Sequence, residues 1–259
     1  MPLRPSPSAL RDRPRKSHWI AVVLWSLVAA AAYGLYSGRL AIPERFNPWA
    51  PLDVMAAPDM LTSYKLSRAR SDPGHCLTAL AQTGMQFDVL PDRTTAPGCG
   101  FENAVRLRSA GIRIGAPVSL SCPMALSFFM WEKHALQASA QQHFGQRVAA
   151  IDHLGSYACR NVNRGEGDSP DAPSVARSRH ATANALDIAG FTLENGQKIT
   201  VLKNWPHAAA SSAPGPQTLM LTDAHNGACQ FFNGVLGPDY NAVHRDHFHL
   251  ETGGYNMCR

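Results

Sequence analysis

The chain has 259 residues, of which 45% are hydrophobic, so it is long enough to bury the core of a full domain. Its formal net charge is +5, but residues 1–16 hold five of the 24 basic residues and one of the 19 acidic ones, which leaves 19 and 18 for the rest of the chain. A nucleic-acid-binding protein needs its basic excess on the folded domain, so the charge distribution excludes nucleic acid as a partner.

Residues 19–38 form an uncharged stretch that follows the basic tail. A helix of this length spans about 30 Å, the thickness of the hydrocarbon core of a bilayer. Trp19 and Tyr36 lie near its ends, where aromatic rings favour the membrane interface. The pattern predicts a cytoplasmic basic tail over residues 1–18 and a transmembrane anchor over residues 19–38.

The basic residues before this span, against Arg39 alone just after it, place the N-terminus in the cytoplasm. We therefore expect a single-pass protein of the inner (cytoplasmic) membrane whose C-terminal domain lies in the periplasm. A cleaved signal peptide is the alternative, disfavoured because no clear small-residue cleavage site follows the span. A buried core helix is a further alternative, and the basic flank argues against it.

Residues 39–75 show little apolar periodicity and contain four prolines, which are Pro43, Pro48, Pro51 and Pro58. A segment of this composition is typical of a stalk or linker. The folded domain is accordingly predicted over residues 76–259.

Two helices stand out within this domain. The clearer one begins at Pro123, which suits a first helical turn, and ends at Gly145. Its apolar stripe comprises Leu126, Phe129, Met130, Leu136 and Ala140. A second helix is predicted over residues 218–232.

Strands are expected around Val105 and Leu107 and over residues 148–152 and 246–251. The pair Asn195-Gly196 predicts a hairpin between residues 185–193 and 198–202. Strands and helices that are grouped separately favour an α+β domain, with helices flanking a small antiparallel sheet.

All six cysteines lie on the exported side of the anchor. An even number of cysteines in that compartment predicts three disulfides. Pairing of neighbours along the chain would give Cys76–Cys99, Cys122–Cys159 and Cys229–Cys258. The alternative, buried free thiols, would require a reducing compartment.

Two segments, Ser178–Asp187 and His244–His249, are dense in side chains that bind metals. On a strand, residues two apart share a face, so His247 and His249 are expected to point into one cavity. Asp187 lies between apolar strand positions, and His180 must approach from the preceding loop.

Two imidazoles and one carboxylate suit Zn²⁺ and leave a fourth tetrahedral position open for water. Zinc lowers the pKa of such a water to about 7 and polarises a carbonyl. The spacing predicts zinc on His180, Asp187 and His249, with His247 as the general base, but the sequence alone does not decide which histidine binds the metal and which accepts the proton. The alternative is that these histidines are ordinary surface or core residues and that Asp187 caps a turn.

Residues from about 76 to 259 resemble the bacterial extensin-like C-terminal domain family. The matching stretches are residues 98–100, 122–124, 155–160, 180–190 and 235–249. The two ligand segments are also similar to those of the lysostaphin, D-Ala-D-Ala-peptidase and hedgehog-like metallopeptidase superfamily. The resemblance implies zinc on the same three residues and His247 as base.

Two departures from the superfamily pattern stand out. Ala183 occupies a position where the pattern has glycine, so a local change of backbone is expected. The Glu-x-x-His ending of many carboxypeptidase relatives is absent, so the chain is more similar to the penicillin-insensitive murein endopeptidases.

Two more residues are candidates for the reaction. Arg160 follows a Gly-Ser-Tyr run that resembles a segment carrying a substrate-orienting arginine, and a surface ion pair is its alternative role. His244 is expected to stabilise an oxyanion or to support the carboxylate ligand.

The expected function is zinc-dependent hydrolysis of amide bonds in peptidoglycan peptides, a substrate inferred from the resemblance and the compartment. A non-catalytic zinc-containing module that binds the cell wall is the first alternative. A structural envelope protein without a metal is the second.

Overall fold

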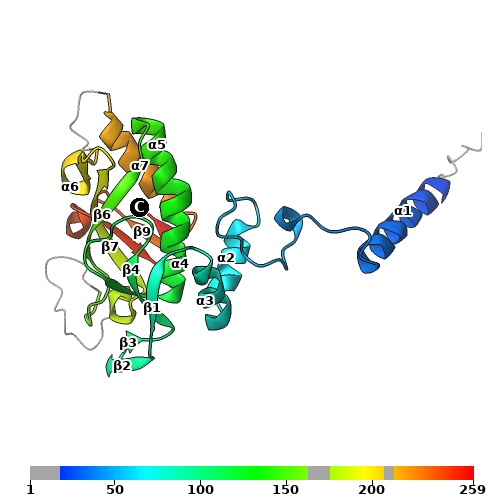
Figure 1. The fold of residues 1–259 in the computed structure, drawn as a ribbon, viewed down its shortest axis with the longest axis horizontal. Coiled ribbons are helices and arrows are strands. Elements are labelled where there is room, and N and C mark those ends of the chain that lie inside the picture. Colours follow the sequence, from blue (N-terminus) through cyan, green and yellow to red (C-terminus); the bar gives the residue numbers. More distant parts are fainter. Residues whose placement is uncertain (1–17, 163–175, 207–212) are drawn as a thin grey trace, which may run out of the picture. The chain divides into compact units, whose positions relative to one another are not determined.

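The computed structural model describes residues 18–162, 176–206 and 213–259. The chain divides into two compact units, one that ends at Asn47 and one that spans Pro48–Arg259 (Figure 1). The first unit contains α1 (His18–Tyr36) and a short 3₁₀ helix, η1 (Glu44–Phe46). By length and composition α1 could cross a membrane or serve as a signal sequence. The basic tail before it lies outside the described residues.

The second unit begins earlier than the domain boundary predicted near residue 75. Leu52 and Val54 are buried in its core, although they lie in the stretch that the prolines mark as a linker. The helix α2 (Thr62–Arg70) follows, and its Arg68 donates hydrogen bonds to the carbonyl oxygens of Pro48 and Trp49 at 2.8 Å each. Residues 48–75 are therefore part of the folded unit, and only residues 37–47 separate it from α1.

A chain that begins at residue 61 should be less stable than one that begins at residue 48. It loses the side chains of Leu52 and Val54 from the core, and a buried aliphatic side chain contributes about 1.5–3 kcal/mol. We expect the free energy of unfolding to fall by about 3 kcal/mol, measured by urea denaturation. Equal denaturation midpoints for the two chains would show that residues 48–60 are a linker after all.

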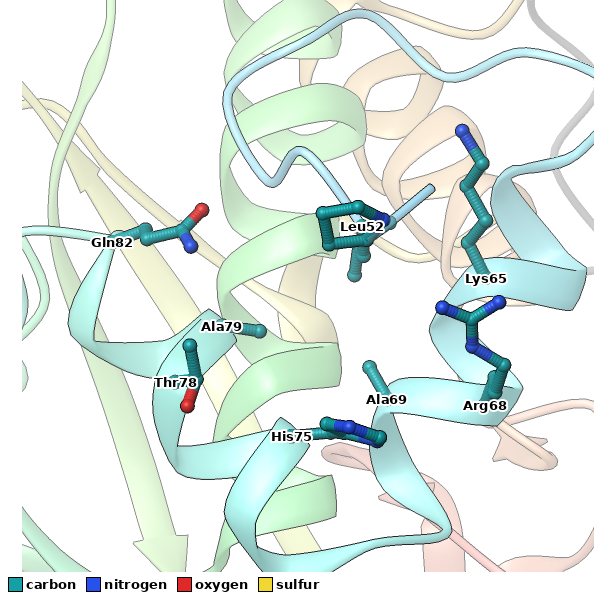
Figure 2. A pocket seen from close by; sticks show the side chains of 9 residues that line it. Leu52, Lys65, Arg68, Ala69, His75, Thr78, Ala79 and Gln82 are labelled. Atoms are coloured by element: carbon teal, nitrogen blue, oxygen red, sulfur yellow. The ribbon is translucent and has the colours of Figure 1, made fainter. Parts of the chain in front are cut away.

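A small hollow of about 110 Å³ lies between this N-terminal segment, α2 and α3 (Pro73–Ala81). Figure 2 shows Lys65 and Arg68 reaching it from α2, and His75 and Thr78 from α3. None of the residues that line it belongs to the predicted metal site, so this hollow lies apart from the candidate chemistry.

The predicted helix from Pro123 to Gly145 is a continuous helical run in three parts, which are α4 (Cys122–Trp131), the π-helical turn η2 (Glu132–Leu136) and α5 (Gln137–Phe144). Ser121 caps its start by accepting a hydrogen bond from the backbone N–H of Met124, and Gly145 ends it with a positive φ of 63°. The run is thus confirmed, with a π turn that the periodicity does not reveal.

The helix α7 (Pro216–Ala228) lies against this run. A Cβ atom on its Gly227 would be 2.6 Å from the Cβ of Ala135, so glycine allows the two helices to approach closely. Trp131 donates a hydrogen bond from its indole nitrogen to the carbonyl of Ala224 and contacts the ring of Phe191 in the sheet. The helices and the sheet therefore share one core.

The largest sheet has six strands, and five of them follow the order β11-β9-β10-β7-β6, with β8 also paired to β7. Their bounds are β6 (Val148–Gly155), β7 (Ala185–Leu193), β8 (Lys198–Thr200), β9 (Gly234–Leu236), β10 (Phe248–Glu251) and β11 (Met257–Cys258). All pairs are antiparallel except β11 with β9. The predicted hairpin at Asn195-Gly196 is confirmed as β7–β8, but residues 201–204 form a short helix, α6 (Val201–Asn204), instead of continuing the strand.

Two smaller sheets complete the unit. One joins β1 (Gln86–Leu90), β4 (Ala104–Ser109) and β5 (Val118–Ser121), and the other is the hairpin of β2 (Arg93–Ala96) and β3 (Cys99–Phe101). Two short 3₁₀ helices, η3 (Arg179–Thr182) and η4 (Ala242–His244), precede β7 and β10. The α+β fold class with antiparallel sheets is confirmed.

The disulfides correct two of the three predicted pairs. Cys229–Cys258 is present as predicted, but the other bonds are Cys76–Cys122 and Cys99–Cys159. The pairs Cys76–Cys99 and Cys122–Cys159 were wrong because neighbours along the chain are not neighbours in space. The helix α3 lies against α4, and the β2–β3 hairpin lies beside the segment that follows β6.

Candidate functional site

Asp187 and His249 face each other across two neighbouring strands. Asp187 of β7 and His249 of β10 are directly paired in the antiparallel register, and His249 Nδ1 lies 2.9 Å from Asp187 Oδ1. Leu186 and Ile188 are buried while Asp187 is partly exposed, so the alternation of the strand turns the carboxylate away from the core.

His180 joins this pair from η3, the short helix that precedes β7. Its Nε2 lies 3.2 Å from Asp187 Oδ2 and 3.1 Å from His249 Nδ1. Ser178 caps η3 by accepting a hydrogen bond from the backbone N–H of His180. The sequence prediction that His180 reaches the strands from a loop agrees with this placement.

Ala183 ends η3 in the left-handed conformation, with a φ of 55°. Only glycine adopts this region without strain, so the alanine keeps the backbone geometry that a glycine would favour instead of changing it. Whether the backbone here differs from that of the superfamily stays a prediction.

In each of the two imidazoles, the outer ring nitrogen, which points away from the trio, lies within hydrogen-bond distance of an acceptor. His180 Nδ1 lies 3.0 Å from the carbonyl oxygen of Ser156, and His249 Nε2 lies 3.0 Å from Glu251 Oε2. A carbonyl and a carboxylate can only accept, so both outer nitrogens carry the proton. When the rings are neutral, the inner nitrogens therefore present lone pairs to each other and to Asp187, as in histidines that bind metals.

The ligand atoms of the trio are close enough together for one metal ion to contact all three residues. Bonds of about 2.0–2.1 Å from a central zinc place neighbouring ligand atoms roughly 3.3 Å apart. His180 Nε2 lies 3.2 Å from Asp187 Oδ2 and 3.1 Å from His249 Nδ1, and His249 Nδ1 lies 2.9 Å from Asp187 Oδ1, so both oxygens of Asp187 are in contact with the imidazoles. With one ligand atom counted from each residue, the three atoms lie within 4.8 Å of one another. His180 and His249 are also buried. His180, Asp187 and His249 thus form a group that could hold a metal ion.

The metal-free protein holds a proton at this place. Burial alone would raise the pKa of Asp187, but hydrogen bonds from His180 and His249 outweigh it and hold that pKa well below its usual range. Burial alone would lower the pKa of His249, but hydrogen bonds to Asp187 and Glu251 raise it to about 9. A proton shared between His249 and Asp187 occupies the position that a cation would take.

His247 lies just before β10 and faces the same carboxylate. Its Nε2 is 3.6 Å from Asp187 Oδ1, while its Nδ1 is 2.9 Å from Asp246 Oδ1. The carboxylate of Asp246 accepts the Nδ1 proton and fixes the orientation of the ring. Neutral His247 therefore directs an unprotonated nitrogen toward the trio, which is the arrangement that a general base requires.

His244 lies beside both His247 and His249, with ring centroids 5.3 and 5.7 Å away. Burial, together with the neighbouring His249 and His247, lowers its pKa to about 4, so it is neutral at physiological pH. Its Nδ1 lies 2.7 Å from Asn241 Oδ1, which also accepts the backbone N–H of Val243. Nδ1 is therefore the protonated nitrogen, and Nε2 is an acceptor.

Arg160 is exposed, and its backbone carbonyl accepts the N–H of Ser178 at the entrance to η3. Its charge makes a small contribution to the lowered pKa of His244. The structure brings together five of the six predicted residues, which are His180, Asp187, His244, His247 and His249, and no contact within the described part of the chain places the side chain of Arg160 among them.

Three supporting residues were absent from the sequence prediction. Glu251 follows His249 by two positions on one strand, so alternation could have identified it. Asn241 caps η4 and holds His244. Ser156 acts through its backbone carbonyl, for which no side-chain pattern exists; its hydroxyl donates to the carbonyl of Ser119 at 2.5 Å.

Comparison with known proteins gives one match. The family model described as "Extensin-like protein C-terminus" matches residues 74–259, which include every residue of the histidine cluster. No curated protein and no solved structure gives a significant match.

Proposed function

The chain belongs to the extensin-like protein C-terminus family, and from this premise we propose that it is a zinc-dependent hydrolase that cleaves amide bonds in the peptides of peptidoglycan. The observation that carries the proposal is the trio of His180, Asp187 and His249, whose ligand atoms lie within 4.8 Å of one another. Two imidazoles and a carboxylate are a ligand set that suits zinc. The similarity of both ligand segments to those of the lysostaphin and D-Ala-D-Ala-peptidase superfamily supports the choice of reaction.

Bound zinc would supply the acidity that activates water and polarises a substrate carbonyl. His247 Nε2 accepts the proton of the attacking water, and Asp246 stabilises the resulting imidazolium through Nδ1. The same Nε2 can then return the proton to the amine that leaves.

The hydrogen bonds of His244 revise its expected part in the reaction. Neutral His244 has its proton on Nδ1, bound to Asn241, so it cannot donate a proton from Nε2 to an oxyanion. We propose that it accepts a hydrogen bond from water or from a substrate N–H. Arg160 is the better candidate to bind a substrate carbonyl or carboxylate, because a guanidinium is a permanent donor.

The proposed location is the periplasmic side of the inner membrane. An apolar α1 at the N-terminus and three disulfides in the second unit support it, since disulfides persist in oxidising compartments. Because only residues 37–47 lie between α1 and the second unit, we expect the hydrolase to act on peptidoglycan close to the membrane.

The test is incubation of the zinc-loaded protein with purified murein sacculi, followed by mass analysis of the soluble fragments. We expect new peptide termini that appear with zinc and disappear when a chelator is added. Stoichiometric zinc without any new terminus would favour a cell-wall-binding module, and a protein that retains no zinc would exclude the mechanism.

The affinity for zinc should fall steeply as the pH decreases. Below a pKa of about 9 the metal-free His249 carries a proton on Nδ1, and zinc must displace that proton. Asp187 remains ionised throughout, so zinc binding releases the proton of His249, and the apparent affinity drops at least about tenfold for each pH unit below 9. Competition with a chromophoric chelator between pH 6 and 8.5 measures this slope.

Glu251→Gln is the matched variant, because it removes the carboxylate that accepts the Nε2 proton while keeping the size of the side chain. The pKa of His249 should fall in this variant. The affinity for zinc, which rises with pH up to that pKa and is constant above it, should therefore reach its plateau at a lower pH than in the parent. A flat pH profile in the parent protein would contradict the assignment of His249 as a ligand.

A further inference from the structure

A polar groove lies beside η3, whose Arg179 and Thr182 line it. It consists of two adjoining cavities of about 580 and 290 Å³, a size that suits a small ligand. Both are lined by Arg70, Ser71, Pro123, Arg179 and Asn184. The larger cavity extends to the β2–β3 hairpin, and the smaller extends to Thr252 and Gly253 after β10.

The groove carries an excess of positive charge. Arg70, Arg93 and Arg179 line it, and Glu102 is the one carboxylate among its lining residues. Arg70 already donates hydrogen bonds to Ser127 Oγ and to the carbonyl of Phe231, so its charge is held in place. With three guanidinium groups and one carboxylate among its lining residues, the groove has an excess of positive charge that favours an anionic ligand.

Arg179, unlike Arg70, has a guanidinium without a hydrogen-bond acceptor among the described residues. It lies over the turn at Gly253 and Gly254, where a Cβ on Gly254 would be 2.6 Å from a guanidinium nitrogen. Within the described ranges, no acceptor is hydrogen-bonded to its guanidinium, and the side chain is only half-buried. Its N–H fork is therefore available to a ligand in the groove.

Arg93 is available in a similar way. It extends from β2 over the ring of Phe101, with the guanidinium carbon 5.6 Å from the ring centroid. Among the residues that the structure describes, no carboxylate pairs with it. A guanidinium stacked on a ring keeps its N–H groups in the plane, where they can bind a carboxylate.

The groove is close to the proposed metal ligands along the chain. Arg179 directly precedes His180 in η3. Asn184, whose Oδ1 accepts a hydrogen bond from Ser121 Oγ, precedes Asp187 by three residues, a length of about 10 Å in a strand. An extended peptide of about three residues covers the same distance.

We propose that this groove binds a carboxylate of a peptide, with Arg179 and Arg93 as the groups that recognise it. The inference rests on the proposed function, since it assigns the carboxylate to the peptide substrate of the histidine cluster. Bidentate pairing of arginine with a carboxylate gives both affinity and orientation. The groove would then favour acidic peptides or peptides with a free C-terminus.

The test compares two probes that differ by one group, N-acetyl-trialanine with a free carboxylate and its C-terminal amide. Binding to the full-length, zinc-free protein in detergent is measured by calorimetry, so that hydrolysis does not interfere. We expect the carboxylate probe to bind at least about tenfold more tightly than the amide. We also expect this difference to shrink at high salt.

Arg179→Gln and Arg93→Gln should each weaken binding of the carboxylate probe about tenfold and leave the amide unaffected. Arg106→Gln, which removes an exposed arginine of β4 outside the groove, is the matched control. The zinc content of Arg179→Gln should equal that of the parent, which shows that η3 keeps its structure. Arg93→Gln, on a separate hairpin, keeps the test valid if Arg179→Gln does not fold.

Equal binding of the two probes, or parental binding by both variants, would overturn the proposal. So would inorganic phosphate that binds the groove while the carboxylate probe does not. Failure of the murein assay with intact probe binding would overturn the hydrolase and leave the groove as a carboxylate site. If the protein cleaves murein but binds the carboxylate and amide probes equally, the proposed carboxylate site is wrong and the proposed hydrolase stands.

Discussion

An Asp187→Ala protein should bind zinc at least about 100-fold more weakly than the parent and release no fragments from murein. Asp187 contacts His180 and His249 at 3.2 and 2.9 Å and is the one negative charge of the trio. Loss of a residue that merely supports a ligand reduces metal affinity about 10- to 100-fold, and loss of the carboxylate ligand itself should cost more. Zinc per chain after dialysis, measured by elemental analysis, gives the result.

Asp152→Asn is the control, because Asp152 is an exposed carboxylate on the neighbouring strand β6. It should retain zinc and activity at the level of the parent. Circular dichroism of Asp187→Ala checks that the sheet is intact, so that loss of metal reflects loss of a ligand. Parental zinc content in a folded Asp187→Ala protein would show that the metal, if any, binds elsewhere.

The strand part of the candidate site was predictable because the alternation of side chains on a strand is regular. His249 and Asp187 each stand between two apolar residues of their strand, and the antiparallel register places them opposite each other. His247 was expected on the same strand as His249, but β10 begins at Phe248. Its ring still faces Asp187, because Asp246 orients it from the preceding turn.

What the sequence could not predict depends on contacts between distant segments. The partner of Cys76 is decided by α3 lying against α4, and the partner of Cys99 by the β2–β3 hairpin lying beside Cys159. The start of the folded unit was similarly hidden, since prolines gave residues 48–60 the composition of a linker while Leu52 and Val54 fill the core. The proline content of this segment indicates only that its backbone is stiff, whereas the burial of its side chains depends on contacts with the rest of the fold.

The Cys99–Cys159 disulfide connects one of these distant contacts to the site. Cys159 follows Ser156 by three residues, and the carbonyl of Ser156 holds His180. The β2–β3 hairpin, which contributes Arg93 to the groove, is therefore covalently attached to the segment that orients a proposed metal ligand. Groove and trio are thus positioned by the same small group of loops around η3.

His247→Ala should separate catalysis from metal binding. His247 contacts Asp187 at 3.6 Å but is not part of the trio, so the zinc content should remain that of the parent. Loss of a general base lowers kcat by a factor of about 10²–10⁴. KM should change little, because the variant removes a group that acts in the transition state. Initial rates of fragment release from murein, at several substrate concentrations, provide both constants.

The controls for His247→Ala decide between a base and the other roles of a histidine in a cluster. His75→Ala removes an exposed histidine of α3 and should leave the rate unchanged. Asp246→Asn should lower kcat less than His247→Ala does, since Asp246 acts only through the ring that it orients. Loss of zinc together with activity would make His247 a ligand, and an unchanged rate with zinc retained would remove it from the reaction. Only a lower kcat at full zinc content agrees with a proton acceptor beside the trio.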